Sequence, residues 1–265
     1  MIMSKRWVLI AVMAAALAGC ATSGINKGDF NIVSTAEEVA MGEEFAIEIE
    51  NQFEVYDDPE LTAYVRSVGG RIAAICDRQD IEYHFSVIKN DEMNAFALPG
   101  GYIYIYTGLM KVLDNEGQLA AVLAHEVGHV TARHSAERLT AMYGAQMAVG
   151  LLLGDNPAQY QVLIANIFST TGFLAYSRAN EYEADRLGTS YTSLAGYDPE
   201  CVGELLGKFV DTEAREPSKL EQWLSTHPPA SERIGKVDIL AASLPLAGVG
   251  ERNTAEYARM KARLP

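Results

Sequence analysis

The feature that most constrains this chain is the pentapeptide His-Glu-Val-Gly-His at residues 125–129. The seven residues before it favour helix and place apolar side chains at helical spacing. Two positions four apart lie about 40° apart around a helix, so His125 and His129 can reach one metal ion. Glu126 can then contact a water on that ion and accept its proton. The pattern predicts a catalytic zinc site with two histidine ligands and Glu126 as general base.

A catalytic zinc site needs a third protein ligand, which the acidic run after Ser177 can supply. Glu181 and Asp185 are four residues apart on a second expected helix, so both point the same way. We expect Glu181 to bind the metal and Asp185 to orient a ligating histidine through its other ring nitrogen. Glu183 is the competing ligand, but it lies about 200° around the helix from Glu181.

Four segments together resemble the gluzincin zinc metallopeptidases of the HtpX and CAAX-prenyl-protease family, in their periplasmic lipoprotein branch. The segments are residues 94–101, 125–129, 180–185 and 227–234, and they occur in the order of that family. The resemblance implies an α+β, helix-rich zincin-like fold with a small sheet whose edge strand precedes the metal-binding helix. It also implies one Zn²⁺ per chain.

The resemblance assigns further residues to the site. It agrees with Glu181 as the third ligand, and it implies that Asn180 supports His129 while Asp185 supports His125. Asn94 and Ala95 match the edge-strand segment that binds an extended peptide through main-chain hydrogen bonds.

A histidine before a proline, His227, is the leading candidate to stabilise the oxyanion of the reaction. A second role stays open, because His227 can instead bind the zinc and silence the site. Arg233 and Tyr176 are weaker candidates for the oxyanion contact. We expect no role in the site for His84, or for His134, which lies about 140° around the helix from His129 and off the metal face.

The first residues read as a secretory leader. A short basic region and an apolar stretch end in Leu-Ala-Gly-Cys, which resembles the bacterial lipobox. We therefore expect a cleaved signal peptide at residues 1–19, lipidation of Cys20, a linker at 20–33 and one metallopeptidase domain at 34–265. Ala21 after the cysteine favours the outer membrane of a Gram-negative bacterium, with the domain facing the periplasm.

Charge and cysteine content limit the partners. The net charge is −14, which argues against nucleic acid and against electrostatic attraction to anionic lipid. Membrane attachment should therefore come from the acyl chains. Cys76 and Cys201 form a possible disulfide in an oxidising compartment, and two buried thiols are the alternative.

Local patterns place the remaining elements. Strands are expected at residues 83–89 and 102–106. Helices are expected at 34–53, 59–76, 109–113, 116–134, 177–195, 199–213, 231–244 and 253–263. Two apolar segments, 141–153 and 160–176, are each too short for a membrane span, and we expect a buried or groove-lining helical hairpin.

The sequence thus predicts a zinc-dependent endopeptidase of the cell envelope. Its expected substrates are extended or unfolded proteins, above all misfolded or misassembled outer-membrane proteins. One alternative is a chaperone or assembly factor that holds such proteins and cleaves little. Another is a lipoprotein whose zinc only stabilises the fold, for which four protein ligands would be typical.

Overall fold

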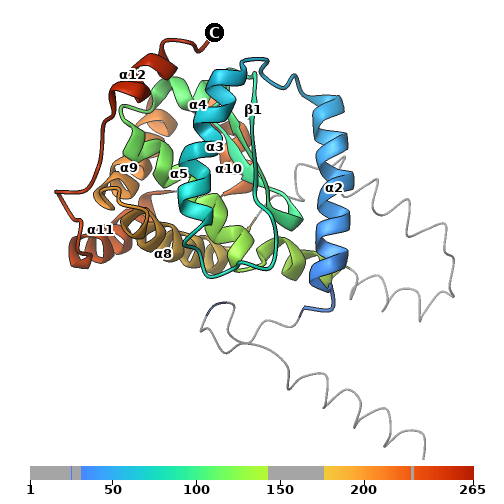
Figure 1. The fold of residues 1–265 in the computed structure, drawn as a ribbon. Coiled ribbons are helices and arrows are strands. Elements are labelled where there is room, and N and C mark those ends of the chain that lie inside the picture. The colour runs from blue at the N-terminus through green and yellow to red at the C-terminus, as the bar shows by residue number, and fades with distance from the viewer. Residues whose placement is uncertain (1–24, 26–30, 143–175, 228–229) are drawn as a thin grey trace, which may run out of the picture.

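Helix α5 (Glu116–Thr131) is the centre of the fold, because every one of its residues is buried. The computed structural model describes residues 25, 31–142, 176–227 and 230–265, and Figure 1 draws the rest of the chain as a grey trace. The leader with Cys20 and nearly all of the expected hairpin lie outside the described residues. None of the helices in these ranges is long and apolar enough to cross a membrane.

The described part is helix-rich with one small sheet, so the expected α+β class is confirmed. In chain order its main elements are α2 (Thr35–Gln52), α3 (Pro59–Ala73), β1 (His84–Ile88), β2 (Ala95–Ala97), β3 (Tyr102–Tyr106), α4 (Thr107–Val112), α5, α8 (Arg178–Leu194), α9 (Glu200–Arg215), α10 (Glu221–Thr226), α11 (Ile234–Ser243) and α12 (Ala255–Lys261).

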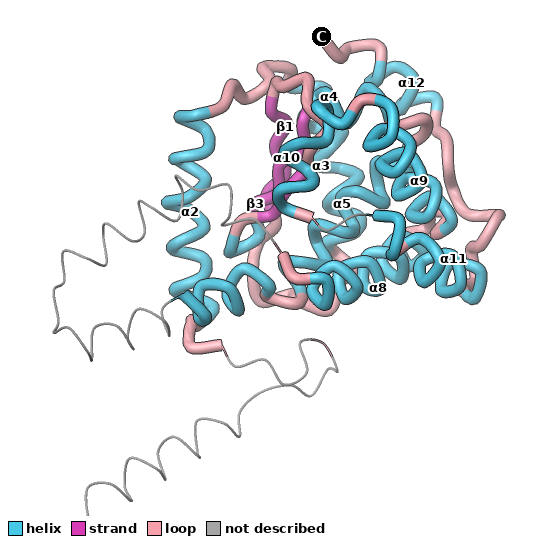
Figure 2. The backbone as a smooth tube through the Cα atoms, turned by 180° about the vertical axis from the view of Figure 1, so that it is seen from behind, coloured by secondary structure: helices cyan, strands magenta, loops and turns pink. Residues whose placement is uncertain are grey.

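The sheet has the order β1-β3-β2, with β1 parallel and β2 antiparallel to the central β3. Side chains alternate along a strand. Ile103 and Ile105 of β3 therefore face one core, shared with α3, α5 and α9, whereas Tyr104 and Tyr106 face a second core under α2. The sheet lies between α2 on one side and the other helices on the opposite side (Figures 1 and 2). Strand β2, which follows Asn94, is an edge strand, as the resemblance implied.

Local sequence signals account for the first two helices. Ser34 and Glu37 form the capping box that opens α2. Asp58 caps α3, which begins at Pro59. Helix α3 ends three residues before the expected end at Cys76, and α5 likewise ends at Thr131 rather than at His134.

Of the two alternatives for the core cysteines, a disulfide and a pair of buried thiols, the structure has the second. Both Cys76 and Cys201 are buried free thiols. The Cys76 thiol lies 3.2 Å from the Tyr83 hydroxyl, in the loop after α3. Cys201 lies in the first turn of α9, with its sulfur 3.7 Å from the side-chain oxygen of Asn115. The two cysteines therefore belong to different neighbourhoods of the core.

A buried ion-pair network joins α2 to the end of α5. Arg78 forms two hydrogen bonds of 2.9 Å to the Glu38 carboxylate and donates to the Val130 carbonyl. Arg133 donates to the same carboxylate at 2.9 Å and to the Val33 carbonyl at 2.7 Å. Arg133 has a φ of 58°, a left-handed conformation that ends α5. Glu38 thus fixes the turn after the metal-binding helix.

Replacing Glu38 with Gln should destabilise the fold strongly. The variant keeps the size of the side chain but leaves the buried Arg78 with only the exposed Asp80, 3.3 Å away, as its counter-charge, which costs up to about 3–5 kcal/mol. Urea unfolding followed by circular dichroism measures this cost. The matched control is Glu44→Gln on the exposed face of α2, which should stay within about 0.5 kcal/mol of wild type. Equal stabilities for the two variants would contradict the role of Glu38.

Candidate metal centre

Close packing of α5 on α8 brings the candidate ligands together. A Cβ atom added to Gly128 would lie 2.9 Å from the Ala184 carbonyl oxygen, and one added to Gly188 would lie 2.9 Å from the His125 nitrogen. Only glycine allows the two backbones to approach so closely. The crossing places the first turns of α8 beside the histidines of α5.

Four side chains converge at this crossing. One ligand atom from each of His125, His129, Glu181 and His227 lies within 4.8 Å of the other three, and all four residues are buried. The Nε2 atoms of the first two histidines are 3.1 Å apart, and Glu181 oxygens lie 3.6 Å and 3.2 Å from them. His227 Nε2 is 3.8 Å from Glu181 Oε1. Ligands about 2.1 Å from a tetrahedral zinc lie about 3.4 Å apart, so these separations fit the ion.

The outer nitrogen of each α5 histidine has its own partner. His125 Nδ1 lies 3.1 Å from Asp185 Oδ1, where the sequence placed it. His129 Nδ1 lies 2.8 Å from the Nδ1 atom of His134, for which we expected no role in the site. Both Nε2 atoms are thereby turned toward the shared centre.

The expectation that Asn180 supports His129 is wrong. The Asn180 side-chain oxygen accepts a hydrogen bond from the Ser177 backbone in the capping box that opens α8. Its amide nitrogen donates to Glu137 at 2.8 Å. The residue directly before Glu181 is therefore used to begin the helix, because a side chain at the third helical position reaches back to the cap.

Arg233 binds carboxylates instead of facing an oxyanion position. Two of its nitrogens donate to Asp185 at 2.7 Å and 2.6 Å, and the third lies 2.5 Å from Glu181 Oε2. All three guanidinium nitrogens are thus engaged, and the oxyanion contact expected from Arg233 is corrected to a positioning contact. The bidentate pair fixes the orientation of Asp185, and the third nitrogen holds Glu181 beside it.

His227 enters the cluster from the loop after α10. Its ring stacks on Trp223, with centroids 4.0 Å apart and planes 11° apart. Trp223 in turn packs on Phe209 at 4.3 Å. His227 Nε2 lies 3.8 Å from Glu126 Oε1, so the expected base borders the same centre.

Strand β2 and Tyr176 line the centre from the other side. Asn94 and Leu98 form backbone hydrogen bonds with β3, through the Asn94 carbonyl and the Leu98 amide. Strand alternation then directs the backbone groups of Ala95 and Ala97 away from β3, on a strand that is buried throughout. The Tyr176 hydroxyl donates to the Ala97 carbonyl at 3.4 Å, and its ring stacks on His129 at 3.9 Å.

Burial controls the protonation of the cluster. Burial raises the pKa of Glu126 to about 7 and that of Glu181 to about 8. It lowers the pKa of His129 and His227 well below the ordinary value, so both rings are neutral. Burial also acts to raise the pKa of Asp185, but the hydrogen bonds and charge of Arg233, together with the contact to His125, outweigh it and hold the value at about 2.

These residues fit a bound zinc ion. Glu181 Oε1 is buried and has no hydrogen-bond donor among the described residues, and it faces a neutral imidazole. Neutral imidazoles and a carboxylate are the ligands that catalytic zinc prefers. A cation here would supply the missing partner and displace protons from the raised carboxyls.

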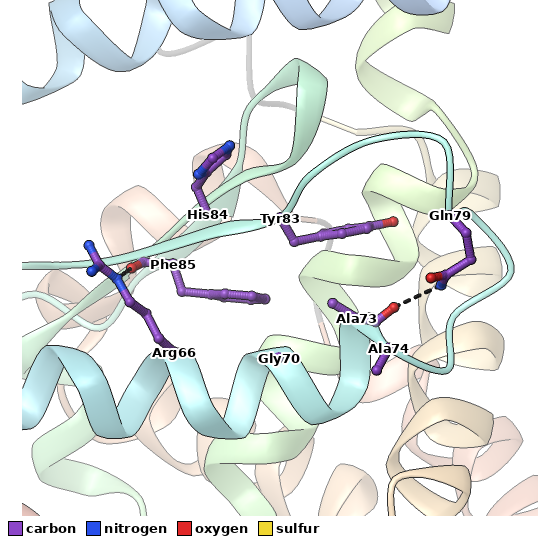
Figure 3. A pocket seen from close by; sticks show the side chains of 8 residues that line it. All are labelled: Arg66, Gly70, Ala73, Ala74, Gln79, Tyr83, His84 and Phe85. Carbon is purple, nitrogen blue, oxygen red and sulfur yellow. Dashed lines mark hydrogen bonds between the residues drawn. The ribbon is translucent and has the colours of Figure 1, made fainter.

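A separate pocket lies away from this cluster. It has a volume of about 540 Å³ and lies between α3 and the start of β1 (Figure 3). Its lining residues are Arg66, Gly70, Ala73, Ala74, Gln79, Tyr83, His84 and Phe85. None of them belongs to the metal cluster, so this hollow is not part of the centre.

Comparison with known proteins agrees with this geometry. The sequence model of peptidase family M48 matches residues 59–241. The chain is 33% identical over 211 residues to the beta-barrel assembly-enhancing protease of Escherichia coli (strain K12), covering 76% of this chain but only 43% of that protein. It is 32% identical over 220 residues to the mitochondrial metalloendopeptidase OMA1 of Schizosaccharomyces pombe, covering 80% of this chain and 64% of that protein.

Metal content tests the ligand set. We expect one Zn²⁺ per chain by inductively coupled plasma mass spectrometry, and a fall of more than about 100-fold in zinc affinity for Glu181→Ala. Asn180→Ala, at the neighbouring residue, is the matched control and should keep the zinc affinity of the wild type. Retention of zinc by the Glu181 variant, or its loss from the Asn180 variant, would refute the assignment.

Proposed function

The chain belongs to peptidase family M48, whose members are zinc-dependent, and we propose that it is an endopeptidase of the bacterial cell envelope. The observation that carries the proposal is the buried Glu126 carboxylate, which borders the four-residue cluster 3.8 Å from His227. A site that only stabilised the fold would have no use for a buried acid/base group beside its ligands.

Glu126 is suited to move protons near neutral pH. Zinc, when bound by His125, His129 and Glu181, supplies Lewis-acid polarisation of a carbonyl and acidifies water. Glu126 accepts the proton of the attacking water and returns it to the leaving amine. Burial raises the pKa of Glu126, and a cation bound beside it would lower that pKa again, so the carboxylate would be ionised and ready to accept the proton.

The substrate is an extended chain that lies along β2. Edge strands bind peptides through main-chain hydrogen bonds, and the backbone groups of Ala95 and Ala97 point away from β3. Asn94 anchors the start of that strand to β3. A chain paired there passes the metal cluster, because α5 packs directly beneath β2.

The substrates that fit best are misfolded or misassembled outer-membrane proteins, which expose extended segments. The name of the Escherichia coli relative, beta-barrel assembly-enhancing protease, supports this class. We place the protein at the outer membrane, held by acyl chains on Cys20 with its domain in the periplasm. The lipobox-like leader supports this placement, and the acidic net charge supports attachment through lipid rather than through charge.

A chaperone or assembly factor for outer-membrane proteins is the second candidate. The words "assembly-enhancing" in the name of the relative favour it. The same edge strand would then hold a client without cleaving it. A variant that lacks the acid/base group distinguishes the two functions, because binding of a client along β2 requires no proton transfer by Glu126.

Replacing Glu126 with Gln should abolish peptidase activity and preserve zinc. The amide has nearly the shape of the carboxylate but cannot accept the proton, so cleavage of casein or of an unfolded porin should fall by at least about 100-fold. A chelator should reduce cleavage by the wild type to the same extent. Undiminished cleavage by the variant would refute the peptidase proposal. Client holding that persists while no wild-type cleavage occurs would favour the chaperone.

His227 sets the resting state in this proposal. As a fourth ligand it occupies the position that a catalytic zinc keeps for water, and Trp223 holds its ring there. Swung aside, the same imidazole can donate to the oxyanion. The placement within the cluster favours the silencing role over the oxyanion role.

His227→Ala should therefore raise basal cleavage of an unfolded protein. If His227 leaves the zinc in about 10% of molecules, its removal should raise the cleavage rate about tenfold. Trp223→Leu removes the stacking and should change the rate in the same direction. If His227→Ala instead cleaves about 100-fold more slowly than wild type while it retains zinc, His227 has the oxyanion role.

A further inference from the structure

We propose that His134 is a positioning residue that holds the His129 imidazole in the tautomer and orientation needed to bind zinc. The proposal deepens the proposed function and rests on it. It starts from one contact, the 2.8 Å hydrogen bond between His129 Nδ1 and His134 Nδ1. Both rings are buried, so no water competes for this bond.

The metal site fixes the direction of the hydrogen bond. His129 Nε2 faces His125 Nε2 and Glu181 at 3.1 Å and 3.2 Å, where only a lone pair can bind a cation. The proton of His129 must then be on Nδ1, and it is donated to His134. His134 accepts it only with its own proton on Nε2, and that nitrogen lies 3.4 Å from Glu183 Oε2.

Glu183 thereby gains a place in the site without touching the metal. It is the second acidic residue of the run that supplies Glu181, and it points to the opposite side of α8. From there its carboxylate meets the far edge of His134. The chain of contacts runs from the metal position through His129 and His134 to Glu183, which repeats the arrangement of His125 with Asp185.

The turn at Arg133 explains how His134 reaches His129. On an uninterrupted helix a residue five positions on lies about 140° away and faces elsewhere. Arg133 instead adopts a left-handed φ of 58°, ends α5, and lets the next helical segment begin at His134. Glu38 and the Val33 carbonyl hold the Arg133 guanidinium, so the turn and His134 are fixed together.

Three variants of the full chain test the proposal. His134→Phe keeps an aromatic ring but has no acceptor, and it should weaken zinc affinity by about 10–100-fold in a chelator competition. His134→Asn places an oxygen near the former Nδ1 and should recover most of that loss. The matched control is His84→Phe, which replaces an exposed histidine stacked on Tyr102 and should bind zinc like wild type.

Two further readouts separate positioning from a structural role. In peptide cleavage, His134→Phe should lower kcat and leave KM unchanged, because the substrate lies along β2 and not on His134. In zinc-loaded wild type, nitrogen NMR should show a proton on His129 Nδ1 and a scalar coupling across the hydrogen bond to His134 Nδ1. The NMR measurement needs no variant, so it decides the matter even where His134→Phe fails to fold.

The outcomes distinguish this proposal from the function on which it rests. A wild-type chain that binds no zinc refutes the proposed function itself. A wild type that binds zinc without the coupling refutes the role of His134 alone. Equal zinc affinities for His134→Phe and His84→Phe would also refute the role of His134 alone.

Discussion

The site depends on the balance of charge in a volume that excludes water. Glu126, Glu181 and Asp185 are buried together, and Arg233 is the one guanidinium that the described residues place against them. Isolated carboxylates are costly in such a place, so burial raises the pKa of Glu126 and of Glu181. When all three are ionised, three carboxylates against one guanidinium carry two net negative charges, which is the charge that a Zn²⁺ ion would neutralise.

Close helix packing fixes the positions of these charged groups and of the histidines. The glycine crossing of α5 and α8 sets the distance between the histidines and Glu181. Arg233 then ties Glu181 to Asp185, which orients His125, and we assign the matching task for His129 to His134. Orientation through the outer ring nitrogen is how proteins fix ligating histidines. The protein's own contacts therefore hold the ligands in place, with Glu126 beside them.

Local rules predicted much of this from the sequence. Four-residue spacing on a helix was enough to predict that His125 and His129 share one helix face, and that Glu181 and Asp185 share another. Capping signals predicted where α2 and α3 begin. The errors have different causes. His134 was dismissed because its spacing assumes a continuous helix, whereas a left-handed Arg133, fixed by the distant Glu38, breaks it. The partners of Asn180 and Arg233 were set by a cap and by tertiary packing, which spacing does not encode.

In the resting protein, three histidines and one glutamate should hold a single zinc ion. X-ray absorption at the zinc edge of the purified full chain is the decisive measurement of this ligand set. We expect a first shell of nitrogen and oxygen only, at about 2.0–2.2 Å, with the outer scattering of three imidazoles. Sulfur scattering at about 2.3 Å, from Cys76 or Cys201, would rule this ligand set out, as would a shell with no imidazole.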